Sequence, residues 1–72
     1  DLIRVVRHLA EDGRVAIRNV RRHIKDDIES LEGDVSEDDV RRAEKVLQDM
    51  TDTHVHKIDD LLHKKEEELL EV

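Results

Sequence analysis

The 72-residue sequence predicts an all-α fold, built as a long antiparallel αα-hairpin. Apolar residues recur at intervals of three and four along two long segments, which is the spacing of amphipathic helices. Neither segment contains proline, and a short stretch with Gly33 separates them. We therefore expect a single domain with a helix over about residues 2–32, a turn over about 33–36 and a helix over about 37–71.

The first helix has an apolar stripe that repeats along its whole length. Gly33 follows the stripe and suits the left-handed backbone conformation in which many helices end, because glycine has no Cβ. The stripe consists of Leu2, Val6, Leu9, Ala16, Val20, Ile24, Ile28 and Leu31.

The second helix has a clear start signal. Ser36 is the expected N-cap, and Asp39 completes an acidic variant of the capping box. Glu37 and Asp38 favour the positive end of the new helix. The apolar stripe of this helix consists of Val40, Ala43, Leu47, Met50, His54, Ile58, Leu61 and Leu69.

His54 lies within the second stripe, where an apolar residue is expected. Antiparallel pairing about the turn places it opposite Gly13 or Arg14. A glycine inside a helix costs about 1 kcal/mol relative to alanine, and room for the imidazole ring across the seam would explain Gly13. We expect His54 to pack in the core or in an interface.

Both stripes are wider than a contact between two helices requires. This width indicates a third helical surface. We expect the hairpin to be part of a three-helix bundle or to self-associate into a four-helix bundle, as a homo-oligomer. The residues that widen the stripes are Val5, Ala10, Val15, Ile17, Val46, Val55 and Leu62.

The composition excludes several classes of protein. Without cysteine there is no disulfide or thiolate metal site, and without Phe, Tyr or Trp the aromatic stacking that reads single-stranded nucleic acid is excluded. No apolar run approaches the roughly 20 residues of a membrane span, and nothing resembles a signal peptide. We therefore expect a cytoplasmic protein with no membrane partner. So short a chain encloses little space, so we expect no enzyme activity, no catalytic residue and no cofactor.

Basic residues concentrate in the first third of the chain. Residues 1–25 hold seven cations and three anions, whereas residues 26–72 hold six cations and seventeen anions. On a helical wheel the seven cations share an arc of roughly 100°, opposite the apolar stripe. Because arginine binds phosphate through two hydrogen bonds, this face is a candidate RNA-binding surface. The alternative is a solvated face that balances the acidic second helix. The candidate RNA-binding residues are Arg7, Arg14, Arg18, Arg21, Arg22 and Lys25, with Arg4 on the same face.

Histidine and aspartate residues share one face of the second helix, which raises the question of a metal site. His56 with Asp60, and Asp59 with His63, are spaced one helical turn apart and could chelate a divalent ion weakly. That face lies opposite the apolar stripe, where further ligands are lacking. We therefore expect exposed polar residues and no metal site.

Long stretches of the chain resemble one known family. LAEDGRVAIRNVRRH, residues 9–23, closely resembles the arginine-rich helix of bacterial ribosome recycling factor. VSEDDVRRAEKVLQDMTD, residues 35–52, and HKIDDLLHKKEEELLEV, residues 56–72, look like the last helix and the C-terminus of that family. The resemblance covers nearly all of the chain without gaps.

The resemblance implies both a fold and a function. The chain would supply the second and third helices of a three-helix-bundle head domain. It would bind large-subunit ribosomal RNA after termination, where the factor helps elongation factor G to split the ribosome. Arg14, Arg18, Arg21 and Arg22 match the arginines with which the family contacts ribosomal RNA.

The chain also departs from the family pattern. These 72 residues hold no counterpart of the long first helix or of the small α/β domain with its two hinge strands, so we expect elongation factor G as a partner of the full-length family protein only. His54 stands where the family usually has an aromatic residue, and His23 replaces the usual acidic residue after the arginine pair. His8, His56 and His63 are also atypical.

Two hypotheses follow from the sequence. The first is an RNA-binding module of a recycling factor that uses the arginine-rich face. The second is an engineered or fragment-derived hairpin that self-assembles and has no ribosome activity, with metal assistance through surface histidines as a variant.

Overall fold

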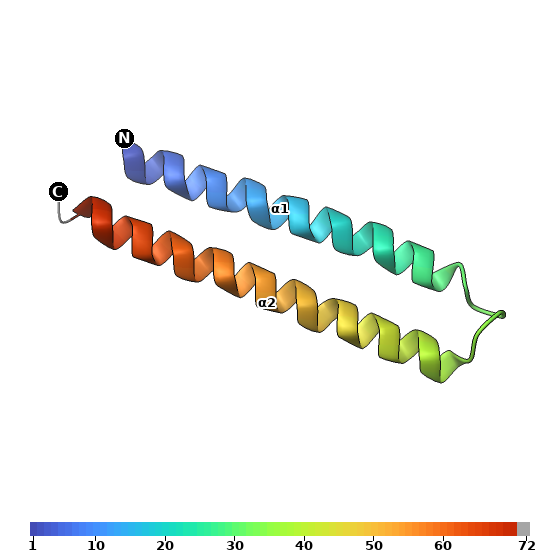
Figure 1. Ribbon diagram of the computed structural model, residues 1–72. Helices are drawn as coiled ribbons and strands as arrows, with labels where there is room; N and C mark the ends of the chain where they lie inside the picture. The colour runs from blue at the N-terminus through green and yellow to red at the C-terminus, as the bar shows by residue number, and fades with distance from the viewer. Residues whose placement is uncertain (71–72) are drawn as a thin grey trace.

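The computed structural model describes residues 1–70 and shows two long helices. Helix α1 spans Leu2–Glu29 and helix α2 spans Glu37–Leu70. They run antiparallel and side by side, with the start of α1 and the end of α2 at one end of the molecule (Figure 1). The Cα trace extends over 57 × 15 × 7 Å. The predicted all-α hairpin is confirmed, whereas the predicted end of the second helix near residue 71 lies outside the described residues.

Helix α1 begins at a capped N-terminus and ends earlier than the sequence predicts. The Asp1 carboxylate accepts a hydrogen bond from the backbone N–H of Arg4 at 3.0 Å. The helix ends at Glu29, and not near residue 32. Its last turn holds acidic residues and no basic residue, which is unfavourable at the negative end of a helix dipole. The Ser30 hydroxyl also donates to the Asp27 carbonyl at 2.6 Å, which favours leaving the helix there.

Residues 30–36 connect the two helices through a tight turn. Gly33 has φ of 96°, so it does take the left-handed conformation, but inside this turn and not next to the helix end. The Leu31 carbonyl accepts from the N–H groups of Asp34 at 3.0 Å and Val35 at 3.2 Å. The Ser36 hydroxyl then accepts from the Asp39 N–H at 3.2 Å and caps α2.

The seam between the helices lies at one edge of the predicted stripe of α1. Among residues 1–70 only Val40, 5% exposed, and Thr51, 7% exposed, are buried. The Thr51 hydroxyl donates to the Leu47 carbonyl at 2.8 Å, so its burial leaves no unpaired group. The half-buried apolar residues of the seam are Ile3, Val6, Ala10, Ile17 and Ile28 of α1, and Ala43, Leu47, Val55, Ile58, Leu62 and Leu69 of α2.

The predicted pairing of His54 with Gly13 or Arg14 is wrong. A Cβ added at Gly13 would lie 3.3 Å from Cδ1 of Ile58, which is one helical turn further along α2. Gly13 therefore allows α2 to approach closely, as expected, but an isoleucine occupies the space. His54 itself is exposed and lies at the edge of an apolar groove. Because α1 is shorter and the connection is longer than predicted, the residues of α1 and α2 pair in a different register from the predicted one.

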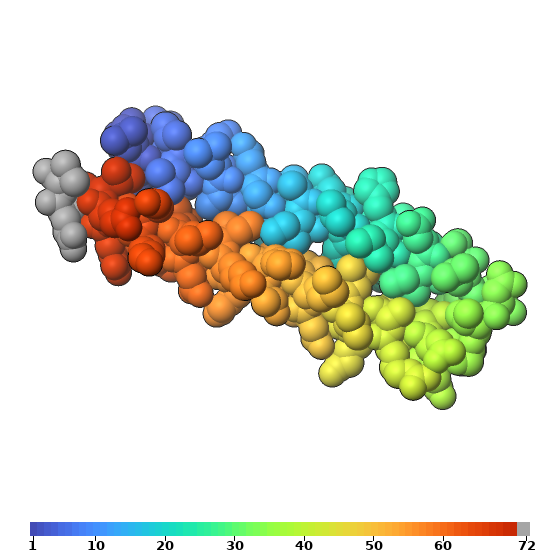
Figure 2. Space-filling model, in the orientation of Figure 1, coloured from blue at the N-terminus to red at the C-terminus, as the bar shows by residue number. Residues whose placement is uncertain are grey.

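Most of the predicted α1 stripe remains on the surface. Leu2 is 67% exposed, Leu9 63% and Val20 57%, and on α2 Met50 is 56% and Leu61 60% exposed. The side chains of the two helices meet along the whole length of the hairpin (Figure 2), so these residues are exposed because α2 packs beside them and not over them. Within residues 1–70 neither helix has an apolar stretch long enough to cross a membrane.

Candidate nucleic-acid interface

The seven cations of α1 form the basic stripe, and helix α2 borders it along one side. The stripe is not uniform, because the acidic side chains of α2 reach some of its members. Within residues 1–70 Arg7, Arg14 and Lys25 are paired with carboxylates, whereas Arg4 and the unpaired centre of the stripe, Arg18, Arg21 and Arg22, are not. Its members are Arg4, Arg7, Arg14, Arg18, Arg21, Arg22 and Lys25.

Arg7 binds Glu66 of α2. Its Nε donates to Oε1 of Glu66 at 2.9 Å. This hydrogen bond and the opposite charge of Arg7 lower the pKa of the Glu66 carboxyl, and the same hydrogen bond raises the pKa of Arg7. The positive charge of Arg7 is thus offset by a neighbouring carboxylate.

Arg14 donates hydrogen bonds to two carboxylates, one on each helix. Its Nε donates to Oδ1 of Asp59 at 2.8 Å, and its Nη1 donates to Oε2 of Glu11 at 3.0 Å. The hydrogen bond to Asp59 raises the pKa of the Arg14 guanidinium. The Arg14 side chain is only 18% exposed. The prediction that all seven cations point away from the helical contact is therefore wrong for Arg14, because α2 packs on the side of α1 nearest the stripe.

The arginines at the centre of the basic stripe differ from Arg7 and Arg14 in their ion pairing. Arg18, Arg21 and Arg22 form no ion pair with any carboxylate in the part of the chain that the structure describes. Arg18 and Arg22 are exposed and Arg21 is half-buried. Lys25, at the far end, lies 3.9 Å from Glu29 of its own helix. Three adjacent guanidinium groups are thus available to an anion.

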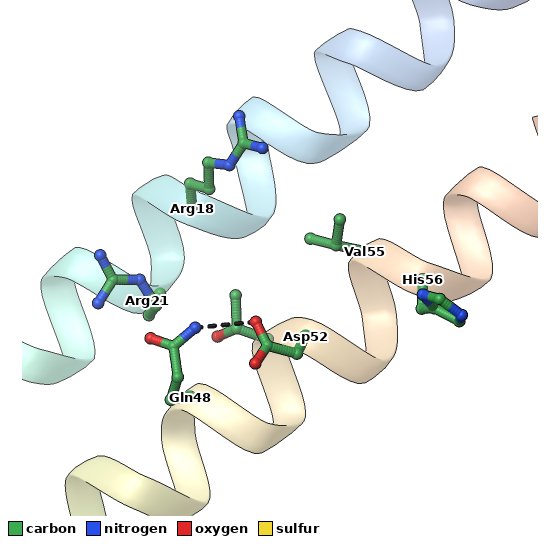
Figure 3. Close-up of a pocket in the computed structure, with 7 residues that line it drawn as sticks. Arg18, Arg21, Gln48, Asp52, Val55 and His56 are labelled. Atoms are coloured by element: carbon green, nitrogen blue, oxygen red, sulfur yellow. Dashed lines mark hydrogen bonds between the residues drawn. The ribbon is translucent and has the colours of Figure 1, made fainter.

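A groove of about 450 Å³ runs between the helices beside Arg18 and Arg21. Figure 3 shows these two arginines on the α1 side, with Gln48, Asp52 and His56 on the α2 side. The Gln48 side-chain amide donates to Oδ1 of Asp52 at 2.9 Å. Neither guanidinium points toward the Asp52 carboxylate (Figure 3).

The metal-ligand candidates are dispersed. Within residues 1–70 no group of three or more histidine, aspartate, glutamate or cysteine side chains converges on a point. Asp59 is engaged by Arg14, whereas His56, Asp60 and His63 are exposed on α2. These side chains are arranged along the helix surface and do not surround a common position.

The residues with which α2 borders the stripe were not predicted. Gln48, Asp52 and Glu66 were not among the candidate RNA-binding residues. A signal was present: Asp52, Asp59 and Glu66 recur at seven-residue intervals and so share one face of α2.

The fold and the interface define an α-helical hairpin with one cationic flank and one open apolar face. The family model described as ribosome recycling factor matches residues 1–70. The chain belongs to the ribosome recycling factor family.

Individual relatives agree with this assignment. The chain is 57% identical to the ribosome-recycling factors of Rubrobacter xylanophilus and Acidothermus cellulolyticus over 74 residues, and 49% identical to that of Clavibacter sepedonicus over 72 residues. Each match covers 100% of this chain, which spans about 40% of the length of the first two relatives and 39% of the third. No solved structure matches the chain.

Proposed function

We propose that this hairpin is the RNA-contacting part of a ribosome recycling factor and that it binds large-subunit ribosomal RNA. The observation that carries the proposal is the unpaired centre of the basic stripe: Arg18, Arg21 and Arg22. Helix α2 offsets Arg7 and Arg14 but leaves these three guanidinium groups without a carboxylate partner among residues 1–70.

The chemistry of the three arginines suits an RNA backbone. Arginine presents a planar fork of N–H donors that matches two phosphate oxygens. Residues 18–22 span roughly 6 Å along the helix axis, so the three groups face a few neighbouring phosphates. Structured RNA is recognised chiefly through shape and backbone contacts, which needs no aromatic side chain.

The proposal is tested by titrating a fluorescently labelled fragment of large-subunit ribosomal RNA with the 72-residue chain. We expect affinity to fall steeply with salt, and the double variant Arg21→Glu, Arg22→Glu to lose at least tenfold in affinity. The double variant Lys57→Glu, Lys64→Glu is the matched control, because it makes the same change of charge at two exposed positions of α2. Binding that tolerates Arg21→Glu, Arg22→Glu, or that the control variant weakens equally, would contradict the proposal.

A second candidate function is self-assembly, which the open apolar face favours. Leu2, Leu9 and Val20 of α1 and Met50 and Leu61 of α2 are all more than half exposed. Monomeric proteins seldom expose so extended an apolar surface. Sedimentation at several protein concentrations tests this candidate: a dimer that dissociates on dilution supports it, and a folded monomer at every concentration excludes it.

A further inference from the structure

Two series of charged residues face each other across the hairpin with the same period. Both have seven-residue intervals, so each series keeps to one face of its helix. Because the helices are antiparallel, the first member on α1 faces the last member on α2. The series are Arg7, Arg14 and Arg21 on α1, and Asp52, Asp59 and Glu66 on α2.

Two of the three pairs are formed. Arg7 donates to Glu66 at 2.9 Å, and Arg14 donates to Asp59 at 2.8 Å. The same register makes Arg21 and Asp52 the third pair, and both line the groove between the helices. No ion pair joins them in the described part of the chain.

Gln48 explains why Arg21 and Asp52 do not form an ion pair. It lies one helical turn before Asp52, and its side-chain amide donates to Oδ1 of Asp52 at 2.9 Å. Figure 3 shows the Asp52 carboxylate turned along α2 toward Gln48, while the guanidinium group of Arg21 extends away from it. The glutamine supplies a neutral donor where the pattern of the other two pairs would place an arginine.

We propose that Gln48 is a positioning residue that holds Asp52 and so keeps Arg21 available for an RNA phosphate. This inference rests on the proposed RNA-binding function and adds a residue that determines whether Arg21 is available to RNA. When the Gln48 hydrogen bond is lost, Asp52 is able to turn to Arg21 and Arg18, which line the same groove from α1. His56, at the other side of Asp52, also lines that groove.

Pairing with Asp52 weakens RNA binding in two ways. A guanidinium engaged by a carboxylate must give up that partner before it binds phosphate. The negative charge of Asp52 also moves toward the position of the phosphate and repels it. Arg7 and Arg14, which are paired with carboxylates of α2, thus have a structural role. Arg21, which is not paired with Asp52, is available for RNA.

The test uses Gln48→Met, which keeps the length of the side chain and removes its donor. We expect Gln48→Met to weaken RNA binding by about two- to fivefold, the range that an exposed ion pair spans. Asp52→Asn alone should change binding little, because Gln48 already keeps Asp52 from Arg21. The double variant Gln48→Met, Asp52→Asn should bind as tightly as Asp52→Asn alone. The double variant Gln48→Met, Asp60→Asn is the control, because it removes the same charge from another exposed position of α2 and should not restore binding.

A second measurement needs no RNA. In free protein labelled with ¹⁵N, the Arg21 Nε–H signal should shift in Gln48→Met and return to its original position in the double variant. A purely structural role of Gln48 predicts no such return, because Asp52→Asn would not restore packing.

The outcomes separate the two proposals. RNA binding that depends on Arg21 but ignores Gln48→Met, with an unmoved Arg21 signal, overturns the role of Gln48 alone. Equal rescue of Gln48→Met by Asp60→Asn and by Asp52→Asn also overturns it, because net charge then explains the effect. Absence of RNA binding by the unmodified chain overturns the proposed function and this inference with it.

Discussion

Arg14 of α1 reaches across the seam and binds Asp59 of α2, with 2.8 Å between Nε and Oδ1. This pair joins the two helices beside Gly13, where an added Cβ would lie 3.3 Å from Cδ1 of Ile58. It also removes one arginine from the surface that faces solvent, because the Arg14 side chain is only 18% exposed. The same contact therefore strengthens the hairpin and shortens the anion-binding part of the basic stripe.

Asp59→Asn should have opposite effects on RNA binding and on stability. Without the carboxylate, Arg14 becomes available to phosphate, and we expect RNA affinity to rise by about two- to fivefold. The midpoint of thermal unfolding should fall, because a contact between the helices is lost. Calorimetry and RNA titration of the same samples check both effects. Asp60→Asn, the matched control, should leave the midpoint unchanged, and a fall in RNA affinity for Asp59→Asn would contradict the account.

The two parts of the basic stripe should differ in salt dependence. Each phosphate contact that is lost lowers the slope of log affinity against log salt by about 0.7 to 0.9. Arg18→Ala should show this change, because its guanidinium group is unpaired within the described residues. Arg7→Ala should change the slope much less, since Glu66 already binds Arg7. Equal slopes for the two variants would show that RNA breaks the Arg7–Glu66 pair.

The Arg7–Glu66 pair should make stability depend on pH in acid. The folded state lowers the pKa of Glu66, so the pair stabilises the fold above the ordinary glutamate pKa of about 4.3. This contribution is lost as the pH falls through the lowered pKa. Glu66→Gln should therefore melt below the unmodified chain at pH 7 and together with it near pH 2. A difference in midpoint that persists unchanged at the acid end would contradict this assignment.

The two glycines should respond in opposite directions to alanine. Gly13→Ala gains about 1 kcal/mol of helix propensity, and the added Cβ needs only a small shift of the Ile58 Cδ1 atom at 3.3 Å. We expect a net stabilisation of about 0.5 kcal/mol. Gly33→Ala should lose about 1–2 kcal/mol, because φ of 96° is unfavourable for alanine. Urea unfolding measures the change in the free energy of unfolding for both variants. Destabilisation by Gly13→Ala would show that the Ile58 side chain cannot shift to make room for the added Cβ.

The sequence predicted the elements of the fold well because the signals for them are local. The Ser36 cap and the positive φ of Gly33 depend on residues within one turn of the chain. The early end of α1 at Glu29 was missed, although the acidic last turn was visible in the sequence.

The contact between the helices was predicted less well. Helical periodicity defines a broad apolar stripe, but it does not say which edge of the stripe meets the neighbouring helix. Leu9 and Val20 were expected at the contact and are exposed, whereas Ile3 and Ile17 lie at the seam. For the same reason Arg14 was placed with the exposed arginines, since its partner Asp59 is distant in the sequence.

The central claim is that Arg18, Arg21 and Arg22 are the groups that meet RNA, while Arg7 and Arg14 hold α2. The direct measurement is an NMR titration of the ¹⁵N-labelled chain with large-subunit ribosomal RNA, followed at the arginine Nε–H signals. We predict large shifts for Arg18, Arg21 and Arg22 and small shifts for Arg7 and Arg14. Shifts confined to Arg7 and Arg14, or no shift at any arginine, would contradict the account.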